Sequence, residues 1–233
     1  MLYRLVYTLV LLASFHGMAV AQTATNPLIE SKAKAILPRV IEWRRHIHQN
    51  PELSNRETKT MEYIAAHLRK LGLEVQTNVA KTGVVALLKG DKPGPVVALR
   101  ADMDALPVEE RVDIPFKSTV KAEYLGGTVP VMHACGHDSH VAILMGTAEV
   151  LASMKKDLKG TVKFIFQPAE EGGGGALRMM DDGLFEHHPC DAVFAMHNMP
   201  GMPVGHLVFR DGAAMASSDY VTIRIHGTGG HGA

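Results

Sequence analysis

The stretch VVALRADMD, residues 96–104, joins a short apolar run to two closely spaced carboxylates. Gly and Pro precede the run and polar residues follow it, which is typical of a buried strand. Ligands of open α/β sheets bind where strands end and loops begin. The stretch therefore predicts a central strand with Asp102 and Asp104 at the edge of the sheet where a site is expected.

The rest of the chain predicts helices alternating with strands. Apolar residues at helical spacing predict helices over 38–48, 57–71 and 140–158. Short apolar runs predict further strands over 84–88, 161–166 and 192–196, and a Gly-rich loop follows at 172–175. This order predicts an α/β domain with a mostly parallel sheet and helices on both faces.

The N-terminal segment, residues 1–21, has the features of an export signal. Arg4 supplies a positive charge, residues 5–13 are apolar, and Ala19-Val20-Ala21 forms a small-x-small cleavage site. A membrane anchor is the alternative, but Ser14 and Gly17 interrupt an apolar run that is already short for a span. We therefore expect a periplasmic or secreted protein with no stable membrane association after cleavage.

The overall charge is balanced, with 24 basic and 24 acidic residues. A neutral chain gives no electrostatic reason to expect nucleic acid or an anionic membrane as a partner. We expect a small-molecule substrate instead, attracted by charges that are local to its site.

Polar residues with catalytic chemistry follow three of the predicted strands, Asp102 and Asp104 being the first such group. Glu170 and Glu171 come after the strand 161–166, and His197 comes after the strand 192–196. A further cluster, CGHDSH at 135–140, precedes a helix. Each cluster alone has an ordinary explanation: a helix cap, a solvated turn or a core histidine. Together at one sheet edge, they indicate a single site.

The two cysteines differ in their surroundings. A disulfide between Cys135 and Cys190 is one possibility for an exported chain. Cys135, however, lies between histidines in MHACGHDSH, where a thiolate is a metal ligand, whereas Cys190 has no such setting. We favour the metal ligand.

Thiolate, imidazole and carboxylate together form a mixed donor set. This set suits zinc and is acceptable to manganese, cobalt or nickel. Two adjacent glutamates can divide the work, since one can bind metal while its neighbour takes a proton from water. A divalent metal lowers the pKa of water and polarises a carbonyl, so the set indicates hydrolysis.

Six motifs follow one another along the chain: WRRHIHQNPELS (43–54), LRADMDALP (99–107), MHACGHDSH (132–140), FQPAEEGGGGA (166–176), MHNMP (196–200) and GTGGHGA (227–233). In this order they resemble the M20 peptidase family. Within that family they are most similar to the branch of hippurate hydrolases, N-acyl amino acid amidohydrolases and plant auxin-conjugate (IAA-amino acid) hydrolases. The resemblance implies a di-metal, aminopeptidase-like catalytic domain interrupted by an α+β lid domain.

The resemblance also implies the metal ligands. Cys135 and His137 match the family's CGH ligands, with the cysteine sulfur bridging two divalent ions. Glu171 matches the ligand at the second position of the glutamate pair, and His197 matches the ligand of the His-Asn motif. The identity of the ions, zinc, manganese, cobalt or nickel, is left open.

Three further residues receive catalytic roles through the resemblance. Glu170 matches the general base, and Asp102 matches a carboxylate that orients a metal ligand. His231 matches a lid histidine that binds substrate and stabilises the oxyanion across a dimer interface. It stands close to the end of this chain, where little sequence remains to hold it.

The domain organisation predicted from the resemblance has three parts. Residues 1–21 are the signal, residues 22–214 belong to the catalytic domain, and residues 215–233 begin the lid, with a strand expected over 219–225. Because further lid sequence and a final histidine ligand are expected in the family, the 233-residue chain is predicted to be an inactive fragment. The complete protein is expected to be a homodimer through its lid.

The leading functional prediction is a metallo-amidohydrolase that cleaves the amide bond of N-acyl or N-aroyl amino acids. One alternative is an exported M20 peptidase of the dipeptidase or carboxypeptidase type, which would prefer substrates with free amines. The other is a non-catalytic metal-binding fragment. Acyl and amino acid preferences do not follow from these residues.

Overall fold

The computed structural model describes residues 26–217, 219 and 221–230, so the expected signal at 1–21 lies outside the described residues. The chain divides into two units, the first extending to Asn198 and the second beginning at Met199. All the regular helices and strands of the described residues belong to the first unit.

The first unit contains a five-stranded sheet with the strand order β1 (Glu74–Val79), β2 (Gly83–Lys89), β6 (Lys159–Gln167), β3 (Lys92–Asp102) and β7 (Ala192–Ala195). The predicted strand 96–99 lies within β3, between β6 and β7. β3 pairs in parallel with both β6 and β7, whereas β2 pairs antiparallel with β1 and β6. Only β2 runs against the others, which confirms the predicted mostly parallel sheet.

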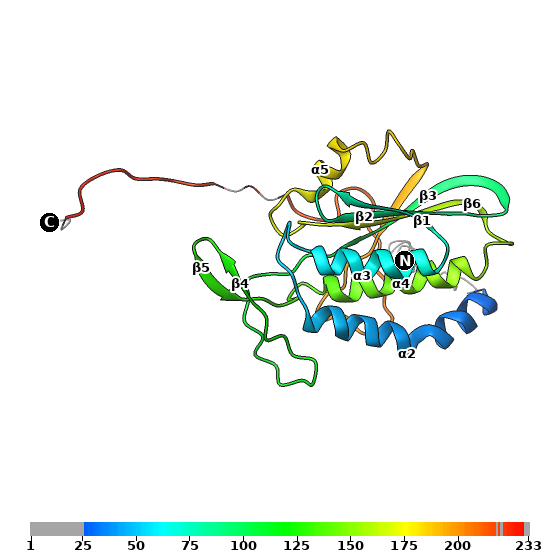
Figure 1. Ribbon diagram of the computed structural model, residues 1–233, viewed down its shortest axis with the longest axis horizontal. Helices are drawn as coiled ribbons and strands as arrows, with labels where there is room; N and C mark the ends of the chain where they lie inside the picture. Colours follow the sequence, from blue (N-terminus) through cyan, green and yellow to red (C-terminus); the bar gives the residue numbers. More distant parts are fainter. Residues whose placement is uncertain (1–25, 218, 220, 231–233) are drawn as a thin grey trace, which may run out of the picture. The chain divides into compact units, whose positions relative to one another are not determined.

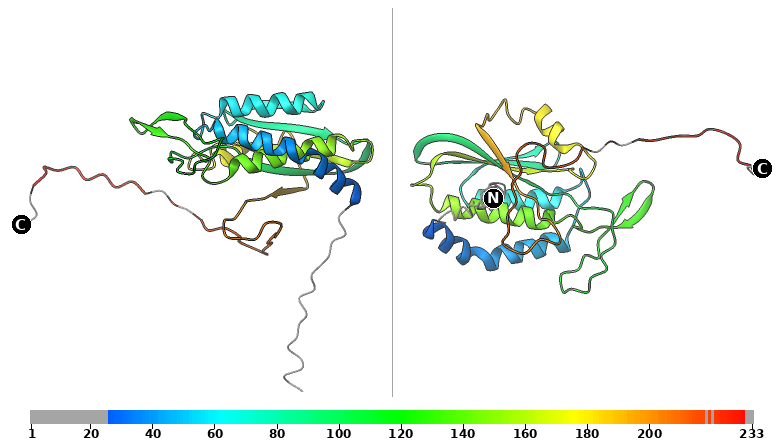
Figure 2. Two further views of the ribbon diagram at one scale, coloured as in Figure 1. Left: turned by 90° about the horizontal axis from the view of Figure 1, so that it is seen from below. Right: turned by 180° about the vertical axis from the view of Figure 1, so that it is seen from behind.

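Helices cover both faces of this sheet, as predicted (Figures 1 and 2). α3 packs on β1 and β2, α4 packs on β3 and β6, and α2 forms an outer layer against α4. On the opposite face, α5 packs on β6. The bounds are Pro27–Gln49 for α2, Thr58–Lys70 for α3, His137–Ala152 for α4 and Gly175–Asp181 for α5.

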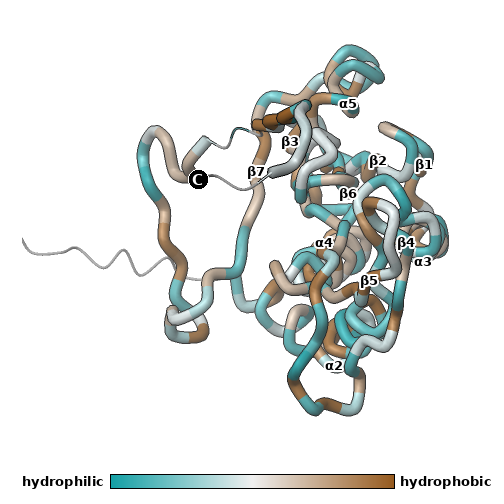
Figure 3. The backbone as a smooth tube through the Cα atoms, turned by 90° about the vertical axis from the view of Figure 1, so that its left-hand side faces the viewer, coloured by the Kyte–Doolittle hydropathy of each residue, from teal (hydrophilic) through white to brown (hydrophobic). Residues whose placement is uncertain are grey.

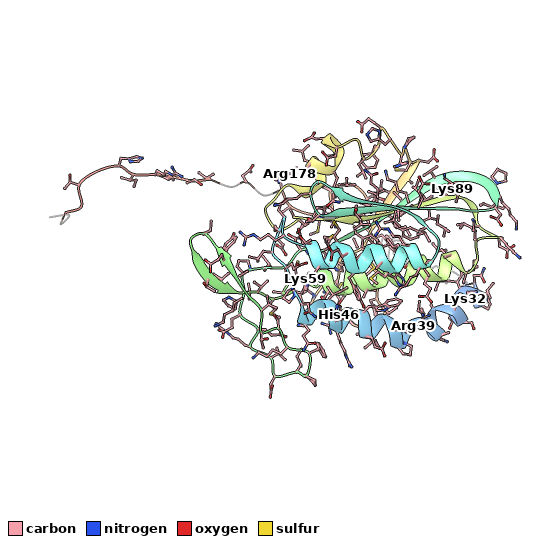
Figure 4. The ribbon with its side chains drawn as sticks, in the orientation of Figure 1. Lys32, Arg39, His46, Lys59, Lys89 and Arg178 are labelled. Atoms are coloured by element: carbon pink, nitrogen blue, oxygen red, sulfur yellow. The ribbon has the colours of Figure 1, made fainter. Side chains whose placement is uncertain are left out.

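Helix α2 begins earlier than the sequence pattern indicated. The expected start was Pro38, but the helix begins at Pro27 and passes through Pro38. The Asn26 side chain caps it by accepting the Leu28 N–H at 3.0 Å, and proline at the first helical position suits that cap. Lys32, Arg39 and His46 recur every seven residues along this helix (Figure 4).

Three strands were not predicted. β1 has the sequence EVQTNV, whose frequent polar residues suit a half-exposed edge strand rather than a buried run. The hairpin of β4 (Lys121–Tyr124) and β5 (Gly127–Pro130) forms a separate two-stranded sheet. Neither β1 nor this hairpin contains a short apolar run, and the strands were predicted from such runs.

Two apolar cores hold the sheet against its helices. The larger one joins α3 and α4 to the sheet, and its fully buried members include Ile64, Leu68, Met145, Phe164 and Phe166. The smaller one lies under α5. Burying a large apolar side chain stabilises a fold by about 1.5–3 kcal/mol, so these cores hold the helices against the sheet. Hydrophobic and hydrophilic segments alternate along the backbone of the helices and strands (Figure 3).

The second unit has no helix or strand among its described residues, so the strand expected over 219–225 is wrong where the structure describes it. Val221, Ile223 and Ile225 are 81%, 81% and 91% exposed, respectively. Alternating apolar residues form a strand only when a partner accepts their backbone hydrogen bonds, and no described residue pairs with them here. In the parts of the chain that are described, no helix combines the length and apolar character required to cross a membrane.

A buried polar network ties the end of α2 to α4. His48 Nδ1 lies 2.9 Å from Asp138 Oδ2, and His48 Nε2 lies 2.9 Å from Glu110 Oε1. Arg44 Nε donates to the same Asp138 oxygen at 2.7 Å. The hydrogen bond to Asp138, supported by Glu110, raises the pKa of His48 above its ordinary 6.5 despite burial. The folded state therefore favours the charged imidazolium.

This raised pKa predicts a pH-dependent stability. Because the folded state binds the His48 proton more tightly than the unfolded state, the stabilisation is complete below pH 6.5 and is lost as pH rises through the folded-state pKa. The free energy of unfolding should fall there by up to about 1.4 kcal/mol per pH unit. Denaturant unfolding of the metal-free chain, with chelator present, measures this slope.

The matched controls for this prediction come from the same helix. His48→Gln should reduce the slope above pH 6.5, leaving the part that comes from the raised pKa of His137, whereas His46→Gln, at an exposed position, should not reduce it. An identical slope in His48→Gln and the unmodified chain would contradict the assignment.

Candidate metal centre

Four segments of the first unit bring their polar residues to one edge of the sheet. Asp102 ends β3, Glu170 and Glu171 follow β6, His197 follows β7, and Cys135 and His137 lie at the start of α4. Among the described residues, their ligand atoms form three overlapping groups within 4.8 Å: Cys135 with His137 and His197, Asp102 with His137 and His140, and His137 with Glu170 and Glu171. The structure thus brings together all four predicted metal ligands and two of the predicted catalytic residues.

His137 lies at the centre of these groups. Its Nδ1 is 2.9 Å from the carbonyl oxygen of Asp104, which can only accept, so Nδ1 donates the hydrogen. Its Nε2 then faces Glu171 Oε1 at 3.8 Å, Glu170 Oε2 at 3.9 Å and Asp102 Oδ2 at 3.6 Å. Burial acts to lower the pKa of His137, but the Asp104 hydrogen bond and the nearby carboxylate charges outweigh it and raise the pKa above its ordinary 6.5. The position between Nε2 and the carboxylates therefore favours a positive charge, and a metal cation would take the place of the Nε2 proton.

His197 is oriented in the same way. Its Nδ1 lies 2.7 Å from the carbonyl oxygen of Asn198 and donates to it. Its Nε2 is left 3.4 Å from Cys135 Sγ. A backbone carbonyl on one ring nitrogen commonly fixes the tautomer of a metal-binding histidine, so both imidazoles are prepared to bind through Nε2.

The buried polar atoms support a metal at this position. Few buried side-chain atoms of the described residues lack a hydrogen-bond partner, and His137 Nε2 and Glu171 Oε1 are two of them. These two atoms face one another. Buried polar atoms normally have a hydrogen-bond partner, so two unpaired polar atoms that face one another indicate a missing ligand between them. Thiol, imidazole and carboxylate together fit a divalent transition metal.

The charges of the cluster lead to the same conclusion. Burial, together with the nearby Glu171 and Glu170 charges, raises the pKa of the Cys135 thiol to about 12. Burial also raises the pKa of Glu171, and the neighbouring Glu170 charge acts in the same direction. Both groups would ionise more readily beside a cation, which would make the cysteine available as a thiolate ligand.

The disulfide alternative for Cys135 does not hold in this structure. Cys135 and Cys190 are both free thiols. Cys190 instead packs beside the smaller apolar core under α5. The two cysteines therefore have different roles, with only Cys135 in the cluster.

His140 was not among the predicted site residues. It follows His137 by three positions on α4, which places both on one face of the helix. Its Nδ1 donates to Asp102 Oδ1 at 2.6 Å, and its Nε2 accepts the Asn198 N–H at 3.0 Å. Hydrogen bonds thus link Asp102 through His140 to Asn198, the residue that follows His197.

Asp102 itself contacts His140 and Arg100. Burial acts to raise its pKa, but the His140 hydrogen bond and the Arg100 charge outweigh it and lower the pKa to about 2. Arg100 Nη1 lies 2.7 Å from Asp102 Oδ2. An ionised Asp102 within 3.6 Å of His137 Nε2 is compatible with the predicted supporting role, which stays a prediction.

Asp104 is the second residue that the sequence did not assign to the site. Its Oδ1 accepts the Glu170 N–H at 3.0 Å, and its Oδ2 accepts the Glu171 N–H at 3.0 Å. Ser54 Oγ donates to Oδ2 at 2.6 Å. The signal in the sequence is its place two residues after Asp102, just beyond the end of β3.

The remaining predicted residue, His231, lies outside the described residues. Its expected role in substrate binding therefore stays a prediction.

Known proteins share this sequence and fold. The model of peptidase family M20/M25/M40 matches residues 98–230. A thermostable carboxypeptidase 2 of Saccharolobus solfataricus is 47% identical over 207 residues, covering 88% of this chain and 50% of that protein. A hippurate hydrolase of Campylobacter jejuni is 46% identical over 189 residues, covering 81% of this chain and 47% of that protein.

A solved structure matches in the same way. The YXEP protein of Bacillus subtilis, described as a dinuclear metal-binding peptidase of the M20 family, superposes with a TM-score of 0.66 and is 44% identical. The match covers 74% of this chain and 46% of that protein. This chain belongs to peptidase family M20/M25/M40, and it spans about half the length of the relatives it matches.

Replacing the thiol tests the metal centre directly. Cys135→Ser should bind cobalt at least about 10-fold more weakly, because a hydroxyl is a much poorer ligand than a thiolate. The thiolate-to-cobalt absorption in the near ultraviolet should also disappear. Cys190→Ser is the matched control and should retain both properties, since its sulfur lies outside the cluster. A cobalt spectrum that survives in Cys135→Ser would contradict the proposed ligand.

Proposed function

We propose that the complete protein is a metal-dependent amidohydrolase that cleaves the amide bond of N-acyl or N-aroyl amino acids. The observation that carries this proposal is the contrast between the two glutamates beside the thiol–imidazole cluster. The Glu171 side chain is only 19% exposed and has an unpaired oxygen that faces His137. The Glu170 side chain is 42% exposed and is available to exchange protons.

Bound divalent ions would polarise the scissile carbonyl and make water a better nucleophile. Cys135, His137, Glu171 and His197 would hold them. Glu170, whose carboxylate reaches within 3.9 Å of His137 Nε2, would accept the proton from water and deliver it to the leaving nitrogen. Asp104 holds the backbone amides of both glutamates, so the two differ only in where their side chains lie. In the proposed mechanism the more exposed Glu170 transfers the proton and the more buried Glu171 binds metal.

A recess beside Glu171 supports an acyl substrate. It has a volume of about 170 Å³ and opens next to the Glu171 carboxylate. Its apolar lining residues are Leu53, Ala105, Leu106, Pro107 and Tyr124, while Ser54, Arg56 and Glu171 add polar groups to its walls. Because Glu171 lines both this recess and the ligand cluster, the recess lies beside the candidate metal site. Its apolar lining suits an acyl or aroyl group better than a charged amine.

The glutamate pair provides the test of the mechanism. Glu170→Gln should retain its metal and lose at least about 100-fold in kcat, because an amide preserves the shape and cannot accept the proton. Glu171→Gln should lose metal, because its side chain is a ligand. Metal content by mass spectrometry and hydrolysis of N-benzoylglycine measure the two effects separately. Full turnover in both variants would refute the mechanism.

The recess provides a test of substrate choice. Leu106→Trp should reduce kcat/KM for N-benzoylglycine at least about 10-fold more than for N-acetylglycine, because the larger side chain occupies space that only the aromatic acyl group requires. Val112→Trp, at an exposed position outside the recess, is the matched control and should not change this ratio. An unchanged ratio in Leu106→Trp would show that the acyl group binds elsewhere.

A peptidase is the second candidate, favoured by the carboxypeptidase name of one relative. The same substrate panel separates the two functions. A dipeptide with a free amine that is cleaved faster than the matching N-acyl amino acids would favour the peptidase.

A further inference from the structure

Glu57 is a buried carboxylate that the proposed mechanism does not use. It stands at the N-cap of α3, but its side chain does not cap that helix. It is 0% exposed and reaches away from the helix to two other segments. Its Oε1 accepts the Ala169 N–H at 2.9 Å, and its Oε2 accepts the Thr82 hydroxyl at 2.6 Å.

Ala169, the residue that Glu57 holds, has an uncommon backbone conformation. Its φ of 51° lies in the left-handed region, which costs an L-residue about 1–2 kcal/mol. Its side chain is fully buried, and a Cβ added at Gly173 would overlap it. Ala169 is followed directly by Glu170, so this backbone conformation sets the direction in which the chain enters the glutamate pair.

Two buried carboxylates together hold three consecutive backbone amides. Glu57 accepts the Ala169 N–H, and Asp104 accepts those of Glu170 and Glu171. The carboxylates come from α3 and from the end of β3, which are far apart in sequence. Each amide therefore has a buried acceptor outside its own loop, next to α3 or to the end of β3, and these three hydrogen bonds oppose relaxation of the left-handed residue.

Burying a carboxylate is costly unless its oxygens are hydrogen-bonded. Burial raises the pKa of Glu57, and the nearby Asp104 charge adds to the effect. A role limited to packing would be served as well by an apolar side chain of similar size, without this cost. An apolar side chain could not accept the Ala169 N–H, so this hydrogen bond requires an oxygen acceptor, which the Glu57 carboxylate provides.

We propose that Glu57 is a positioning residue for Glu170: its carboxylate holds the Ala169 peptide in the left-handed conformation and so aims the neighbouring base at the reacting centre. This inference rests on the proposed function, because it assumes that Glu170 transfers the proton. Glu57 itself touches neither the ligand cluster nor the recess.

The experiment compares three variants of the complete protein. Glu57→Ala removes both hydrogen bonds. Glu57→Gln keeps an oxygen for the Ala169 N–H and an amide group that can donate to the Thr82 hydroxyl. Thr82→Val removes only the second hydrogen bond and serves as the matched control for a purely structural role, since it leaves the Ala169 contact in place.

Hydrogen exchange of the 168–171 segment gives a readout that requires no activity. Glu57→Ala should lose protection of the Ala169 amide, while Glu57→Gln and Thr82→Val should retain it. Cobalt binding should persist in all three variants, because Cys135, His137 and His197 do not contact Glu57 and the Glu171 amide is still held by Asp104. Unchanged protection in Glu57→Ala would overturn the proposal.

Kinetics give the second readout. A base misplaced by about 1 Å can cost about 100-fold, so Glu57→Ala should lower kcat by that order with KM changed less than about 3-fold. Glu57→Gln should recover most of kcat, and Thr82→Val should keep it even if thermal stability falls. Equal losses of kcat in Glu57→Ala and Thr82→Val would overturn the proposal, because they would follow stability alone.

The two readouts also separate this inference from the proposed function. If the unmodified protein hydrolyses no amide, the proposed function fails, while amide exchange still decides whether Glu57 holds the loop. If the unmodified protein is active and Glu57→Ala retains full kcat with an unprotected Ala169 amide, the positioning role is wrong and the proposed function stands.

Discussion

The parallel pairing of β3 with β6, in a register that places Asp102 beside Gln167, is the constraint on which the rest of the site depends. Parallel strands end at the same edge of a sheet, so the polar residues that follow β3 and β6 arrive together. β7 joins β3 in parallel and brings His197 to that edge as well. A shift in this register would separate Asp102 and Asp104 from the glutamate pair.

Crowding several carboxylates around one imidazole is unfavourable unless the charge is balanced. The protein provides part of that balance through Arg100, His140 and backbone amides, and these keep Asp102 and Asp104 ionised despite burial. Two of the unpaired buried atoms, His137 Nε2 and Glu171 Oε1, face the position where a divalent ion would supply the rest. Burial thus creates the electrostatic demand that metal binding would satisfy.

Much of this site is held by residues that would not contact a substrate. Asp104 fixes the backbone of the glutamate pair, Glu57 holds the preceding residue, and His48 joins Asp138 to Glu110 beside the first turn of α4. These side chains come from α2, α3 and the loops that follow β3. The helical layer therefore contributes to the geometry of the edge as well as to the apolar core.

The sequence by itself determined the α/β class and the order of the main elements, because apolar periodicity is a local property, and the resemblance of its motifs predicted the candidate metal ligands. It missed β1, the β4–β5 hairpin and the start of α2, and it wrongly predicted a strand over 219–225, since pairing and capping depend on partners. Only the tertiary structure decided that Cys135 lies beside His197 rather than in a disulfide, and that Glu57, Asp104 and His140 support the site. These contacts join residues far apart in the chain, and their geometry exists only after the sheet has brought its strand ends together.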